Sequence, residues 1–172
     1  MVTLVLETGA GVPGANSYAS LEYADEYFLS HPFYSDSWSG IISSDKRTAL
    51  LIAASRQLDV QFLWRGTRVS TTQGLEWPRY GAYDDYGQYI SQNIVPERVV
   101  QATCEMAYYL SKGDVSQNTQ ASQGLDRLKI DVIELEFSGS TSQPVVGSAV
   151  ISLLRGLGDF ASGIRVRRVV VG

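Results

Sequence analysis

The sequence contains few of the residues on which catalytic and metal sites usually depend. Among its 172 residues there is one cysteine and one histidine. A single cysteine, Cys104, excludes an internal disulfide and a cysteine-based metal cluster, so we expect it to fill the core. A two-histidine metal site or a Ser–His nucleophile pair would have to use His31, which precedes Pro32 at an expected helix end and suits a capping or surface role. We therefore expect neither an enzyme nor a cofactor-binding protein.

Long apolar runs are missing as well. No stretch approaches the roughly eighteen residues that a membrane span needs, and the N-terminus lacks the basic start and continuous apolar run of a signal peptide. The hydrophobic fraction of 44% is normal for a globular protein. We expect a folded protein that is neither secreted nor membrane-spanning.

Positive charge is scarce over most of the chain. The net charge is −4 and the isoelectric point is near 4.9. This balance argues against a general nucleic-acid binder, because such proteins depend on Lys and Arg to neutralise phosphates. Residues 165–172 are the exception, since they hold three arginines among valines and no acid. The sequence predicts a basic, β-prone C-terminal tail on an acidic body.

Hydrophobic periodicity predicts a mainly α protein, a small bundle of three core helices with a shorter helix near the C-terminus. The core helices are expected over residues 20–30, 44–63 and 96–112, and the shorter one near 148–157. The expected caps are Ser20 for the first helix, Ser44 or Asp45 for the second, and Pro96 at the start of the third. The expected buried faces carry Leu21, Ala24 and Phe28, then Leu51, Ala54 and Leu58, then Val99, Thr103, Met106, Ala107 and Leu110.

Extended structure is expected at both ends of this bundle. A short strand is predicted over residues 2–6, followed by a Gly-rich turn over 9–14 that lacks the Lys-Ser/Thr ending of a phosphate loop. Apolar residues alternate with charged ones over 126–138, with a change of phase near Val132, which predicts a β arm with a bulge or bend. We expect a helical core domain over 1–125, a β arm and short helix over 126–163, and the basic tail over 164–172.

The connection over residues 65–94 carries an unusually apolar stretch, Gln73–Arg79, which we name the Trp–Pro segment. A Trp in a connecting segment must find a pocket to retain its burial free energy. We expect Trp77 to pack against the second and third core helices, Pro78 to stiffen the exit, and Glu76 and Arg79 to face partners. The segment is thus predicted to anchor the loop that follows it.

Tyrosine recurs at every third position in that loop, at Tyr80, Tyr83, Tyr86 and Tyr89. Beside Arg79 these rings could stack on single-stranded bases. The neighbouring Asp84 and Asp85 would repel phosphate, and as adjacent acids in a Gly- and Tyr-rich loop they are more typical of a solvated turn than of a metal site. A cluster of tyrosines packed between subunits is therefore favoured.

The chain resembles a family of tailed-phage and prophage proteins, often labelled DnaT-like single-stranded-DNA-binding proteins, whose relatives include head–tail connector proteins. The resemblance covers about residues 16–110 and depends on the order and spacing of several short stretches. These are residues 16–28 (NSYASLEYADEYF), 46–59 (KRTALLIAASRQLD), 64–66 (WRG), 73–79 (QGLEWPR) and 94–107 (IVPERVVQATCEMA).

The resemblance implies a virion structural protein at the junction of capsid and tail, assembled in the bacterial host cytoplasm. Connectors of this kind form a ring, usually of twelve subunits, beneath the portal, extend the DNA channel and give a tail or stopper protein its platform. Packaged double-stranded DNA would pass through an acidic lumen without specific binding. We expect no membrane partner; a single-stranded-DNA or replication-associated binding protein is the alternative. The residues expected to dock on the portal by strand addition are Arg165, Val166, Arg167, Arg168, Val169, Val170 and Val171.

Overall fold

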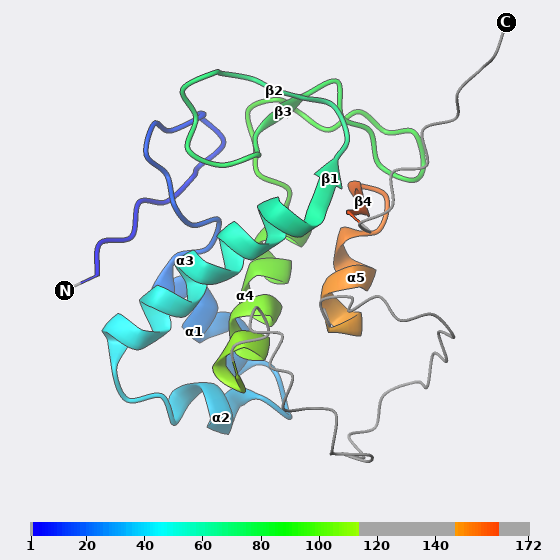
Figure 1. Cartoon of the computed structure of the whole chain (residues 1–172). Helices are drawn as coiled ribbons and strands as arrows, with labels where there is room; N and C mark the ends of the chain where they lie inside the picture. Colours follow the sequence, from blue (N-terminus) through cyan, green and yellow to red (C-terminus); the bar gives the residue numbers. More distant parts are fainter. Residues whose placement is uncertain (1, 114–146, 162–172) are drawn as a thin grey trace, which may run out of the picture.

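The computed structural model describes residues 2–113 and 147–161 and is mostly helical, as predicted (Figure 1). All four expected helices form. Two short antiparallel sheets add to them, β1 with β4 and β2 with β3. The elements are α1 (Leu21–Leu29), α2 (Ser35–Ser39), α3 (Ser44–Gln61), β1 (Phe62–Trp64), β2 (Thr67–Arg68), β3 (Arg79–Tyr80), α4 (Glu97–Ser111), α5 (Ser148–Leu154) and β4 (Gly158–Phe160).

The core lies where α3 and α4 cross, with α1 on one side of α4 and α5 on the other (Figure 1). The predicted helix faces are buried there: Leu51 and Leu58 from α3 and Val99 and Met106 from α4 are almost completely excluded from solvent. Cys104 is buried among them, as expected. The largest fully buried side chains are Trp38, Trp77, Tyr18 and Phe28, so aromatic rings supply much of the apolar surface removed from water.

Serine side chains cap the N-termini of α1 and α3. Ser20 Oγ accepts the Tyr23 backbone N–H at 3.1 Å, which confirms the predicted cap of α1. In α3 the cap is Ser43, whose Oγ accepts the Lys46 N–H at 3.2 Å, so the cap expected at Ser44 or Asp45 was placed too late. The shift has a local cause: three polar residues in a row can each cap, and only the backbone path selects one.

The strand predicted over residues 2–6 does not form. This stretch has only a single bridge, between Leu6 and Ser17. The backbone of residues 16 and 17 bonds to Val5 and Glu7, and the side chain of Asn16 adds two bonds: its Oδ1 accepts the Val5 N–H at 2.8 Å and its Nδ2 donates to the Thr3 carbonyl oxygen at 3.0 Å. The prediction was wrong because a short apolar run does not show whether a partner long enough to form a strand pair exists.

The Gly-rich turn that follows is organised around one buried acid. The carboxylate of Glu7 accepts backbone N–H groups from Gly9 at 2.9 Å, Gly11 at 3.0 Å and Val12 at 2.7 Å. A ring of converging N–H groups of this kind can bind an anion. Here the chain supplies that anion itself, in keeping with the expectation of a turn rather than a phosphate loop.

Three features of the fold were not predicted. Residues 35–39, for which the sequence predicted no helix, form α2, whose Trp38 packs on Phe28 with ring centroids 4.6 Å apart. The connection over 65–94 contains β2 and β3, paired through Thr67↔Tyr80 and Arg68↔Arg79. Strand β1 pairs with β4 from the far end of the chain, Phe62↔Phe160, and pairings between such distant residues leave no local periodicity.

The β arm expected over 126–138 and the tail expected over 164–172 lie outside the described residues. Within the ranges that the structure does describe, no helix has the length and apolar character to cross a membrane.

Candidate interaction surface

The Trp–Pro segment, Gln73–Arg79, is fixed to the body by the burial of Trp77. Its side chain has no exposed surface and meets Trp64 edge to face, with ring centroids 5.9 Å apart. Its backbone N–H donates to Tyr18 Oη at 3.1 Å. The following peptide bond, Trp77–Pro78, is cis. We expected this ring to pack against the second and third core helices; the contact seen is with Trp64 of β1.

Asp59, near the end of α3, connects this segment to the body. Its Oδ1 accepts hydrogen bonds from Tyr18 Oη at 2.6 Å and Trp64 Nε1 at 3.2 Å, and its Oδ2 accepts the Glu76 N–H at 3.1 Å. Burial raises the pKa of Asp59 to about 6, because desolvation outweighs the hydrogen bonds that favour the charged form. Burial beside Asp59 raises the pKa of Tyr18 as well.

Arg79, at the end of the segment, faces the interior rather than a partner. Its guanidinium donates to the carbonyl oxygens of Arg65 and Gly66, both at 2.8 Å, and to Glu76 Oε2 at 2.6 Å. The side chain is only 7% exposed. A planar guanidinium with five donors can hold several carbonyl oxygens at once. The prediction that Arg79 faces a partner was therefore wrong: this arginine ties β1, β2 and β3 together.

The Tyr-rich loop, which we define as residues 80–89, extends from this anchored base. Tyr83 and Tyr89 form an antiparallel bridge, and their rings pack with centroids 5.7 Å apart. Asp84 closes the tip, since its Oδ1 accepts the N–H groups of Tyr86 at 2.9 Å and Gln88 at 2.8 Å. Asp84 therefore has a turn-forming role, as its Gly- and Tyr-rich surroundings suggested.

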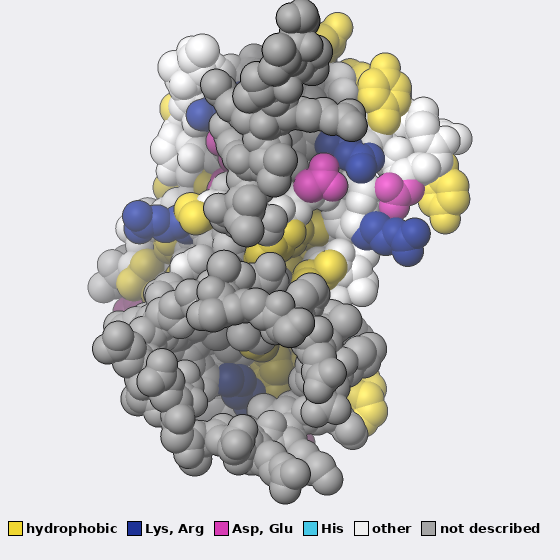
Figure 2. Space-filling view, turned by 45° about the vertical axis from the view of Figure 1, so that its right-hand side comes forward, with side chains coloured by type: hydrophobic (Ala, Val, Ile, Leu, Met, Phe, Trp, Pro, Cys, Tyr) yellow, Lys and Arg dark blue, Asp and Glu magenta, His cyan; other side chains and the backbone are white. Residues whose placement is uncertain are grey.

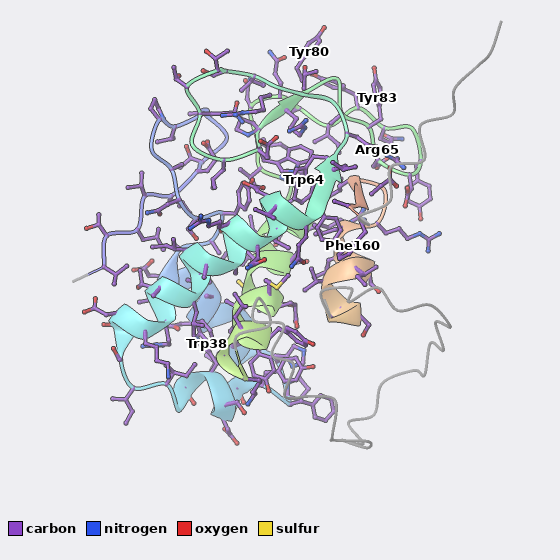
Figure 3. The ribbon with its side chains drawn as sticks, in the orientation of Figure 1. Trp38, Trp64, Arg65, Tyr80, Tyr83 and Phe160 are labelled. Atoms are coloured by element: carbon purple, nitrogen blue, oxygen red, sulfur yellow. The ribbon has the colours of Figure 1, made fainter. Side chains whose placement is uncertain are left out.

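The four tyrosines of this loop all reach solvent. Figure 3 shows Tyr80 and Tyr83 directed outward at the upper edge, with Trp64 beneath them inside the molecule. Whole-residue exposure is 61% for Tyr80, 51% for Tyr83, 88% for Tyr86 and 52% for Tyr89. The hydrogen bonds of the loop thus hold large, partly apolar rings at the surface.

Asp85 attaches the Tyr-rich loop to the turn between α5 and β4. Its carboxylate lies 3.9 Å from Arg65 Nη1 and 3.7 Å from Arg155 Nε. It also lies directly against Gly156, where a Cβ would come within 2.2 Å of Asp85 Oδ1. Gly156 has φ +83°, a backbone conformation that favours glycine, and a side chain at this position would have to displace the Asp85 carboxylate.

The arginines around this surface are already held by acids or carbonyl oxygens. Arg65 and Arg155 share Asp85, and Arg98 donates to the carbonyl oxygen of Leu153 at 2.7 Å. Arg68 donates to the Gln73 carbonyl oxygen. Figure 2 shows the result: dark-blue and magenta side chains alternate beside yellow ones, and the part of this face not covered in grey has no broad basic field. The surface is therefore aromatic, and three of its arginines lie beside acidic side chains: Arg65 and Arg155 beside Asp85, and Arg68 beside Glu76.

Of the predicted tyrosines, Tyr83 and Tyr89 are in contact, and Tyr80 and Tyr86 are exposed on the same loop. Arg165 to Val171, the predicted portal-binding residues, lie outside the described residues. Sequence reasoning missed Asp59 and Tyr18. Asp59 directly follows Leu58, a residue of the predicted buried face, and this position of a carboxylate was the sign in the sequence that could have indicated its role.

Within residues 2–113 and 147–161, no group of three or more Cys, His, Asp or Glu could hold a metal ion. His31 stacks on Tyr34 with ring centroids 4.1 Å apart, and its Nε2 is 3.9 Å from Glu105. Its ring is part of an aromatic cluster at the end of α1.

Comparison with known proteins gives a family and no individual relative. No curated protein and no solved structure matched the chain. A family model described as "Putative DnaT-like ssDNA binding protein" matches residues 2–169. The match spans nearly the whole sequence, including the stretches on which the resemblance was based. The chain therefore belongs to this DnaT-like family.

Proposed function

We propose that this protein is a virion structural subunit that associates with copies of itself, as a head–tail connector beneath the phage portal. The observation that carries the proposal is the Tyr-rich loop, which presents four exposed rings on a base fixed by Trp77 and Arg79. Exposed tyrosines with few free charges are typical of the buried centre of a protein–protein interface. The viral setting and the ring, with twelve subunits expected, depend on the resemblance described above.

The charge of the described surface supports this proposal over binding to phosphates. A protein that binds single strands without sequence preference combines aromatic platforms with a positive groove that follows the backbone. The platforms are present here, but Arg65 and Arg155 are both engaged by Asp85. In a ring, an acidic lumen would let packaged double-stranded DNA pass without adhering.

Single-stranded-DNA binding is the second candidate, because the family description names it. The same tyrosines would then stack on bases, each contributing about 1–3 kcal/mol. Binding would weaken as salt increases, in proportion to the phosphates neutralised.

One set of variants separates the two candidates. Tyr80→Ser with Tyr86→Ser removes the two most exposed rings of the loop, and Tyr80→Phe with Tyr86→Phe is the matched control that keeps them. The wild-type chain and both variants are examined by mass photometry and negative-stain electron microscopy, with and without the portal. Binding to labelled oligo-dT is measured by fluorescence anisotropy at low and physiological salt.

The connector proposal expects rings in the wild-type and Phe variants, on the portal or free, and their loss in the Ser variant. It also expects negligible oligo-dT binding at physiological salt. Salt-sensitive oligo-dT binding that the Ser variant loses, with no ring under any condition, would instead establish the second candidate.

A further inference from the structure

A groove of about 550 Å³ lies between α1 and α2, at the end of the molecule away from the Tyr-rich loop. Figure 3 shows this separation, since Trp38 is near the lower end and Tyr80 and Tyr83 are at the upper edge. Phe28, Leu29 and Trp38 give the groove its apolar lining. The polar lining consists of Asp25, Glu26, Ser35, Asp36, Ser39 and Arg47.

The apolar lining of the groove is buried at Trp38 and exposed to solvent at Leu29. Trp38 is buried, stacks on Phe28, and donates from Nε1 to Asp25 Oδ1 at 2.7 Å. Leu29, at the end of α1, is 81% exposed. A chain lying in the groove would bury this leucine against its own apolar side chains.

The groove has an excess of negative charge. Arg47 neutralises Asp25 through an ion pair at 2.5 Å. Glu26 and Asp36 carry no ion pair to any residue in the described ranges. An occupant with alternating apolar and cationic side chains would match both the apolar lining and the two free acids.

The chain contains one segment with this chemistry. Residues 165–171 read Arg-Val-Arg-Arg-Val-Val-Val and include no acid. We propose that this C-terminal segment of one copy docks in the α1–α2 groove of a neighbouring copy. The inference rests on the proposed function, because it requires copies of the chain to lie side by side.

The reach of the tail favours a neighbouring copy over the same chain. The described chain ends at Ala161, whose N–H donates to the Gln61 carbonyl oxygen at 2.7 Å, at the C-terminal end of α3. Arg47, which lines the groove, is near the other end of α3, about 21 Å along the helix axis. Arg165 is four residues beyond Ala161 and reaches at most about 14 Å. Arg165 therefore cannot reach Arg47 in the groove of its own chain, so a basic segment that lies along the whole groove favours a neighbouring copy.

A disulfide-trapping experiment on the full chain tests the contact directly. Ser39→Cys places a thiol in the groove without changing its charge, and Val169→Cys places one in the tail. The native Cys104 is buried and does not compete. The two single variants are mixed and oxidised mildly, and products are identified by mass spectrometry. In the control mixture, Ser91→Cys takes the place of Ser39→Cys; Ser91 is exposed and follows the Tyr-rich loop in the sequence.

A charge exchange gives the second, independent readout. Glu26→Lys with Asp36→Lys should weaken self-association, measured by mass photometry over a dilution series, by at least about tenfold, because two lysines in the groove would then face the arginines of the tail. Adding Arg167→Glu and Arg168→Glu to this variant should restore association. A structural defect in α1 or α2 would not be rescued by changes in the tail.

A disulfide between the Ser39→Cys and Val169→Cys chains, with rescue by the charge exchange, supports the inference. Rings that form without this disulfide overturn the inference and leave the proposed function intact. The disulfide without rings overturns the connector proposal and leaves the contact intact. Loss of portal attachment on Arg167→Glu with Arg168→Glu, at unchanged self-association, overturns the inference in favour of a tail that docks on the portal.

Discussion

Replacing Trp77 by alanine tests whether the Trp–Pro segment anchors the surface above it. The side chain is completely buried and meets Trp64 edge to face at 5.9 Å. Truncating a fully buried Trp costs about 3–5 kcal/mol through lost transfer free energy and a residual cavity. Because a domain of this size is stable by roughly 5–15 kcal/mol in total, Trp77→Ala should remove a large share of the stability.

A second substitution at the same position separates ring burial from hydrogen bonding. The indole Nε1 of Trp77 is buried and has no hydrogen-bond partner among the described residues. Trp77→Phe keeps most of the ring and removes this unpaired N–H, so it should cost far less than Trp77→Ala, about 1–2 kcal/mol.

The assay is urea unfolding followed by far-ultraviolet circular dichroism, with Tyr86→Ala as the surface control. Tyr86 is 88% exposed, and its removal should change the free energy of unfolding by less than about 0.5 kcal/mol. A loss below about 1 kcal/mol for Trp77→Ala would refute the anchoring argument. If that small loss came with failure to assemble, Trp77 would belong to an interface instead.

Three further predictions follow from contacts around the same frame. Asp59 has its folded pKa raised to about 6, above the unfolded value near 3.9, so the folded state binds the extra proton and stability should fall as pH rises from about 4 to 6. Urea titrations across this range should show Asp59→Asn without that fall, and parallel curves for both proteins would contradict it. Gly156→Ala should destabilise the protein by at least about 1 kcal/mol more than Gly87→Ala, because both positions have positive φ but only Gly156 lies against Asp85. Hydrogen exchange should show faster exchange of the Tyr-rich loop in Gly156→Ala but not in Gly87→Ala. Equal effects of the two substitutions would exclude docking of the loop through Asp85. Glu7→Gln should cost about 1–3 kcal/mol by thermal unfolding, since an amide cannot accept all three N–H groups that the carboxylate accepts, and an unchanged melting temperature would mean that solvent replaces those bonds.

The helices could be predicted because their information is local. Leu51, Ala54 and Leu58 recur at helical spacing and are buried as expected, and Ser20 caps where a polar side chain precedes an apolar run. The same reasoning missed α2, a helix of five residues that is too short to show periodicity. It also placed a strand at residues 2–6, where the chain forms only one bridge, Leu6 with Ser17, and is held further by the side chain of Asn16.

Several residues of the candidate surface could be named from the sequence, but the contacts between them could not. The spacing of Tyr80, Tyr83, Tyr86 and Tyr89 indicated a cluster, and the burial of Trp77 was expected from its size. The orientation of Arg79 could not be read from the sequence, because it depends on carbonyl oxygens of residues 65 and 66 brought near by chain reversal. The attachment of Asp85 to Gly156 joins positions 71 residues apart, and only the fold makes them neighbours.

The contact between Asp85 and Gly156 links the Tyr-rich loop to the part of the chain that leads to the basic tail. Asp85 holds the Tyr-rich loop against the α5–β4 turn, and the chain leaves β4 at Ala161 toward the basic tail. The turn is therefore attached on one side to the aromatic surface and leads on the other to the segment proposed to enter a neighbour's groove. A subunit contact that displaced the loop would also move the point from which the tail departs. We therefore expect Gly156→Ala to weaken the disulfide contact between the Ser39→Cys and Val169→Cys chains, even though Gly156 lies in neither the groove nor the tail. Trapping of the two cysteine variants in the Gly156→Ala background measures this effect, and an unchanged yield would show that the Tyr-rich loop and the tail act independently.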